Sequence, residues 1–111
     1  MGVIKHSAIV VTGYEEAIKH AYHKALHVFT DAFPSLTKGI LVSEIVKGVK
    51  NGTHSFFIAP DGSKEGWESS NRGDVAREKF VEWLKETNEV YFVEVMFGED
   101  CNNACIVNEN L

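Results

Sequence analysis

Two kinds of hydrophobic pattern alternate along the chain. Four short runs are rich in β-branched and aromatic residues, as strands usually are. They cover residues 3–11, 40–49, 53–59 and 90–97. Two longer stretches carry apolar residues three and four positions apart, the spacing that gives a helix one apolar face. They cover residues 12–33 and 71–86. The pattern therefore predicts the order strand, helix, strand, strand, helix, strand.

Local signals indicate where these elements begin and end. Thr12 and Glu15 have the spacing of a capping box, so Thr12 is the expected N-cap of the first helix. Pro34 prevents that helix from continuing. Asn51-Gly52 favours a tight hairpin turn, so we expect the second and third strands to be antiparallel.

This order predicts an α+β fold of the ferredoxin-like βαββαβ type, with a four-stranded antiparallel sheet and both helices on one face. Right-handed crossovers would place the first and third strands in the centre. We expect residues 1–111 to form a single domain, in which residues 98–111 are a partly extended C-terminal tail or a short edge strand.

The other face of the sheet is expected to be apolar too. Alternation places Ile9 and Val11 on one side of the first strand and Ala8 and Val10 on the other. Two helices can cover only one of these faces, and an exposed apolar face marks a surface for a partner. We therefore expect a homo-oligomer, most simply a dimer that packs sheet against sheet.

Composition narrows the classes of partner. The net charge of −5 argues against binding to a DNA or RNA backbone, which requires a basic surface. We expect no signal peptide and no membrane-spanning segment, because Met1 leads directly into a strand pattern and no apolar run approaches ~20 residues. Cys101 and Cys105 could close only a short loop, so reduced thiols in a cytoplasmic protein are expected.

The segment from residue 59 to 67 carries the most chemistry. Pro60 ends the preceding strand, and Asp61-Gly62 favours a turn. The following helix offers free backbone N–H groups and the positive end of its dipole to an anion. The predicted ligand-binding residues are Ser63, Lys64, Trp67, Arg72 and Arg77. The alternative is a rigid turn, with Trp67 packed inward and Asp74 paired with Arg77 or with a loop N–H.

Histidines suggest two other chemistries. Glu16, His20, His23 and His27 share one helix face, but that face lies opposite the apolar stripe, so we expect it to be solvated and to bind no metal. His6-Ser7 and His54-Ser55 resemble the paired motifs of 2H phosphoesterases, in which two histidines act as acid and base on a cyclic phosphate. In that family the hydroxyl residue lies two positions after the histidine, whereas here it is adjacent and so points to the opposite face.

A longer block resembles small uncharacterised proteins encoded by tailed phages. It covers residues 56–84 and contains the run A-P-D-G-S-K-E-G-W, and the first strand and the run V-E-V-M-F-G extend the likeness. Small phage proteins of this size include anti-defence proteins that sequester cyclic nucleotide immune signals without cleaving them. By this analogy, the resemblance implies a host-cytoplasmic protein that needs no cofactor.

Three functions are therefore expected, and they are given in the order in which the sequence favours them. The first is a non-enzymatic, oligomeric protein that binds and sequesters a small phosphorylated nucleotide signal, because no set of acid, base and nucleophile stands out. The second is a protein-binding inhibitor of a host defence factor, which would use the open sheet face. The third is a cyclic phosphodiesterase of the 2H type that uses His6 and His54.

Overall fold

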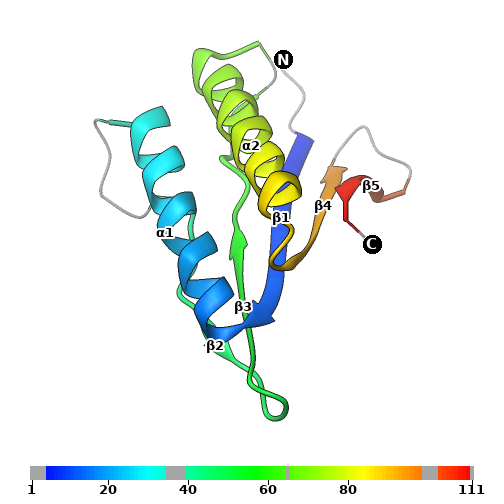
Figure 1. The fold of residues 1–111 in the computed structure, drawn as a ribbon. Coiled ribbons are helices and arrows are strands. Elements are labelled where there is room, and N and C mark those ends of the chain that lie inside the picture. Colours follow the sequence, from blue (N-terminus) through cyan, green and yellow to red (C-terminus); the bar gives the residue numbers. More distant parts are fainter. Residues whose placement is uncertain (1–4, 35–39, 65, 99–102, 111) are drawn as a thin grey trace.

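The computed structural model describes residues 5–34, 40–64, 66–98 and 103–110. Within them, two helices and five strands follow one another in the order β1, α1, β2, β3, α2, β4, β5 (Figure 1). The strands are β1 (Lys5–Tyr14), β2 (Val46–Lys47), β3 (Thr53–Ile58), β4 (Tyr91–Gly98) and β5 (Cys105–Glu109). The helices are α1 (Glu15–Ala32) and α2 (Glu68–Thr87).

The strands form one antiparallel sheet in the order β2-β3-β1-β4-β5. This confirms the α+β class and corrects the expected number of strands from four to five. The additional strand comes from the C-terminal segment, where β5 pairs with β4 through a register shift between Glu94 and Val95. The possible short edge strand within residues 98–111 is therefore confirmed as β5.

The second strand is much shorter than its pattern predicts. Leu41 has a φ of 68°, a left-handed conformation that interrupts an extended strand. Residues 41–43 still follow β3, because Ala59 N donates to Leu41 O at 2.7 Å and Ser43 N donates to Phe57 O at 2.9 Å. Only the two residues of β2 pair with β3 as a regular antiparallel strand. The hairpin turn itself is confirmed, since Asn51 and Gly52 have φ values of 61° and 64°.

Both helices lie on the same face of the sheet and cover the core (Figure 1). Phe80 of α2 lies at the centre of an aromatic cluster, with its ring 6.2 Å from that of Phe29 and 6.4 Å from that of Phe56. The largest fully buried side chains are Phe29, Phe80, Ile9, Ile18, Ile58, Leu84 and Val11. Each of them contributes about 1.5–3 kcal/mol by leaving water. Of the helices in the described part of the chain, neither is long and apolar enough to cross a membrane.

The predicted capping box is wrong. Thr12 is still within β1, where its Oγ1 lies 2.9 Å from Ser55 Oγ across the strand pair. The strand continues to Tyr14, which becomes the N-cap of α1 and makes no capping side-chain hydrogen bond among the described residues. Cross-strand pairing with β3 and β4 therefore outweighs the local capping signal. Helix α2 also begins earlier than expected, directly after Trp67.

Candidate functional site

The predicted binding loop is fixed to α2 by its own polar side chains. Asp61 Oδ1 accepts a hydrogen bond from Ser63 N at 2.8 Å, which closes a tight turn around Gly62. The hydroxyls of Ser63 and Ser69 lie 2.6 Å apart and join the loop to the first turn of the helix. Ser63 is buried, so its hydroxyl serves this connection and does not face solvent.

Arg77 completes the same connection. Its Nη1 donates to Asp61 Oδ2 at 3.2 Å and its Nη2 donates to Asp74 Oδ1 at 2.5 Å. The arginine is only 6% exposed. Gly73 makes the approach possible, because a Cβ at this position would collide with the Asp61 carboxylate. The pairing of Asp74 with Arg77 in the rigid-turn interpretation is confirmed, and the guanidinium already contacts two carboxylates.

Lys64 and Trp67 form a separate pair on the surface. The lysine Nζ lies 5.8 Å from the centroid of the tryptophan ring, within cation–π range. Trp67 is 54% exposed, so its ring does not pack inward as the rigid-turn alternative required. An exposed ring at a helix N-terminus can stack on a planar group, but its nearest cation already covers part of it.

The five predicted residues do not converge on one pocket. Arg72 and Arg77 are five positions apart on α2, which separates them by roughly 140° around the helix axis. Arg77 lies toward β1 and β4, where it lines cavities of about 380 Å³ and 130 Å³ together with Ser7 and Met96. Arg72 instead lines a groove between α1 and α2, which Trp67 and Lys64 do not line.

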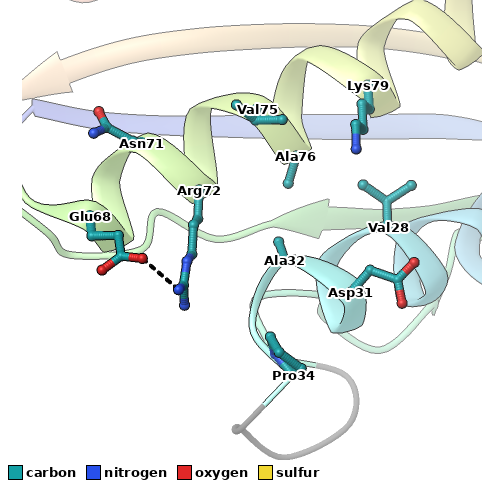
Figure 2. Close-up of a pocket in the computed structure, with 10 residues that line it drawn as sticks. All are labelled: Val28, Asp31, Ala32, Pro34, Glu68, Asn71, Arg72, Val75, Ala76 and Lys79. Atoms are coloured by element: carbon teal, nitrogen blue, oxygen red, sulfur yellow. Dashed lines mark hydrogen bonds and ion pairs between the residues drawn. The ribbon is translucent and has the colours of Figure 1, made fainter.

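This groove has a volume of about 480 Å³ (Figure 2). That volume lies within the range of ~300–1,000 Å³ that small-molecule sites usually occupy. Its apolar wall comes from both helices and consists of Val28, Ala32, Val75 and Ala76. Its polar rim consists of Asp31, Glu68, Asn71, Arg72 and Lys79, and Pro34 closes one end.

The rim carries two cations that differ in their partners. Arg72 donates to Glu68 Oε1 at 2.6 Å, drawn as the dashed line in Figure 2. Both side chains of this pair are at least half exposed, so the pair contributes little and can exchange for another anion. Lys79 makes no ion pair or hydrogen bond with any other described residue. Sequence reasoning missed the groove, although Arg72, Val75 and Lys79 fall on one helix face at i, i+3 and i+7.

The histidines of α1 are exposed, as expected, and they do not converge. His20 Nδ1 lies 3.1 Å from Glu89 Oε2, and its ring meets the edge of Trp83. His27 instead lies 3.5 Å from Asp31.

At the start of the same helix, a hydrogen bond and the charge of Lys19 lower the pKa of Glu15, and Glu15 in turn raises the pKa of Lys19. In the described part of the chain, no group of three or more metal-ligating side chains occurs. Cys105 is an exposed thiol, and Cys101 lies outside the described residues.

His6 and His54 are far apart in the sheet. His54 pairs with Gly13, and Gly13 lies seven residues further along β1 than His6, from position 6 to position 13. At ~3.3 Å per residue, this separates the two histidines by roughly 23 Å along the strand. They also lie on opposite faces, because their β1 positions differ by an odd number. This arrangement cannot bring both rings to one cyclic phosphate.

No protein-family model, curated protein or solved structure matches this chain.

Proposed function

We propose that this protein is a non-enzymatic binding protein that sequesters a small phosphorylated nucleotide in the groove between α1 and α2. The observation that carries the proposal is the pairing of an apolar wall with two cations at one rim. A nucleotide presents a ring that fits against Val28 and Val75 and phosphates that meet Arg72 and Lys79. The sequence resemblance to phage proteins supports a cyclic nucleotide signal in the host cytoplasm as the ligand class.

The position of β1 between β3 and β4, with both helices on one face, supports a ferredoxin-like sheet extended by β5.

Lys79 and Arg72 would bind the phosphates of the ligand in different ways. Lys79 forms no ion pair with another described residue, so a phosphate can approach it without displacing a carboxylate. Arg72 has to exchange Glu68 for the phosphate, which costs little because the existing pair is exposed. Of the carboxylates on the rim, Asp31 lies near His27, and Glu68, which is largely exposed, returns to solvent when Arg72 binds the phosphate. Sequestration requires these contacts alone and no bond cleavage.

The test is calorimetric titration of a panel of cyclic di- and trinucleotides against the wild-type protein and three alanine variants. Arg72→Ala and Lys79→Ala should each weaken binding about tenfold or more, because each removes a charged hydrogen-bond donor. The loss should be larger at low salt, where screening is weaker. Lys64→Ala is the matched control, since this lysine belongs to the loop and does not line the groove. It should leave the affinity unchanged.

Three results would contradict the proposal. If no member of the panel binds, the ligand class is wrong. If Lys64→Ala weakens binding while both groove variants do not, the ligand site is the loop at residues 59–67. If a cyclic nucleotide is consumed during the titration, the protein is an enzyme. Circular dichroism of each variant confirms that the fold is intact before the affinities are compared.

A further inference from the structure

We infer that the uncovered face of the sheet is the interface of a symmetric homodimer, formed with a second copy of this chain. This surface is called the open face below. It is defined by strand register, because residues directly opposite each other in antiparallel strands point to the same side. Its members are His6, Ala8, Val10, Thr12 and Tyr14 of β1, Thr53, Ser55 and Phe57 of β3, Val46 of β2, Tyr91, Val93, Val95 and Phe97 of β4, and Ile106 and Glu109 of β5.

Burial along β1 shows which face the helices leave open. Ile9 and Val11 are completely buried beneath the helices, whereas Val10 between them is 42% exposed. Val10 lies opposite Phe57 on one side and Val93 on the other, so these three side chains form a row across the centre of the sheet. Phe57 is also 43% exposed. The centre of the open face is therefore apolar and in contact with water.

The exposed apolar side chains of the protein are concentrated on this face. Seven of the eleven large apolar side chains that are exposed among the described residues belong to it. They are Val10, Tyr14, Val46, Phe57, Tyr91, Phe97 and Ile106. The His6 and Phe97 rings pack together where β1 begins and β4 ends, with their centroids 5.3 Å apart, which extends the apolar surface along these two strands. A patch of this extent on a protein surface normally marks an interaction site.

A second copy fits the chemistry of this face. The rows that cross β3, β1 and β4 contain no Asp, Glu, Lys or Arg, so a two-fold axis through them brings no like charges together. The net charge of −5 is carried largely outside these rows, and Glu109, which pairs with Val93, adds one carboxylate to the open face at its β5 edge. A charged partner would find no complementary charges in these rows. A largely apolar surface with no charge in its central rows is instead complementary to itself.

The size of the face also suits a dimer. The strands contain ten, two, six, eight and five residues. At ~3.3 Å per residue and ~4.8 Å between strands, they cover roughly 500 Å² per copy. Two copies would bury about 1,000 Å², which is the smallest area expected of a biological interface. Two sheets stacked in this way would form a layer of side chains ~10 Å thick, as in a β-sandwich.

Pairing at the sheet edges is the weaker alternative. The β2 edge has only two residues, and the register of the β5 edge is shifted by an irregularity between Glu94 and Val95. Short strands and bulges both hinder the addition of another strand. Face-to-face packing therefore buries more apolar area than extension of the sheet.

The inference is tested by sedimentation equilibrium of the wild type and three variants at micromolar concentrations. The wild type should sediment as a dimer. Val10→Glu should raise the dissociation constant on the order of 100-fold, because the symmetric interface then buries two unpaired carboxylates. Tyr91→Glu should raise it as well, and its more exposed site makes it safer for folding. Val49→Glu is the matched control, because this fully exposed valine lies on the hairpin outside the open face, and it should leave the dimer intact.

Each outcome decides the matter. A wild type that sediments as a monomer overturns the inference and leaves the open face for a different protein partner, as an inhibitor would require. A dimer that survives both Val10→Glu and Tyr91→Glu places the interface elsewhere and overturns it too. Dissociation caused by Val49→Glu as strongly as by Val10→Glu would show a general effect of charge. The ligand titrations use a different surface, so failure of either proposal leaves the other standing.

Discussion

At the scale of single residues, Gly73 allows the loop at residues 59–67 to be joined to α2 through Asp61 and Arg77. Ala usually stabilises a helix by ~1 kcal/mol relative to Gly. At Gly73 we expect the opposite sign, because a Cβ there would displace the Asp61 carboxylate from Arg77. Both side chains of that ion pair are at most 10% exposed. Gly73→Ala should therefore lower the free energy of unfolding by about 1–3 kcal/mol in urea denaturation.

The physical cause can be isolated with a second substitution. In an Asp61→Ala background the carboxylate that would collide with the new methyl group is gone, while Arg77 keeps its bond to Asp74. Gly73→Ala should then be neutral or stabilising, so the two substitutions should be strongly non-additive. Equal losses in both backgrounds would mean that Asp61 is not the group that excludes a side chain at position 73.

At the scale of elements, the addition of β5 depends on asparagine side chains. Asn110 accepts a hydrogen bond from Phe92 N at 3.0 Å and donates to Val90 O at 2.6 Å, so its amide acts as one more residue of the strand. Asn108 donates to the buried Glu94 at 2.6 Å. Asn110→Ala should cost about 1–2 kcal/mol of stability and speed hydrogen exchange at the Phe92 amide. Asn103→Ala, at an exposed position before β5, should do neither. Unchanged exchange at Phe92 would contradict the role of Asn110.

Some of the helices, strands and turns could be predicted from the sequence, and others could not. The two helices and the Asn51-Gly52 turn were predictable because periodicity and turn chemistry are local signals. The length of β2 was not, because it depends on the left-handed conformation of Leu41, which the apolar pattern does not encode. The Thr12 cap failed for a related reason, since cross-strand pairing extended β1 through the capping position.

For the candidate site, the residue types were predicted better than their grouping. Arg72 and Arg77 both follow the loop in sequence, yet the helix turns one toward the groove and the other toward the sheet. Lys79 was overlooked because it lies about three helical turns beyond the loop, where only the packing of α1 against α2 makes it part of a groove. Tertiary packing, and not the local pattern, defines the groove.

At the scale of the whole molecule, the fold separates its two proposed functions. The helices cover the core and form the groove, while the opposite side of the sheet is left for the second copy (Figure 1). A dimer that uses the open face therefore leaves the groove of each copy accessible to a ligand. Binding and assembly should be additive, so Val10→Glu should abolish the dimer without changing the affinity for a cyclic nucleotide.

Assembly also predicts how heat stability depends on concentration. Because unfolding of a dimer releases two chains, mass action stabilises the folded state as protein concentration rises. A ~100-fold increase contributes roughly 2.7 kcal/mol per dimer, and about half of that per chain should raise Tm by about 5 °C for a chain of this length. Sodium sulfate should raise Tm further, because it strengthens apolar burial. In the Val10→Glu variant, Tm should no longer depend on concentration. A wild-type Tm that stays constant over the same range would mean that the open face is not buried against a second copy, and its apolar rows would then be solvent-exposed in the folded protein.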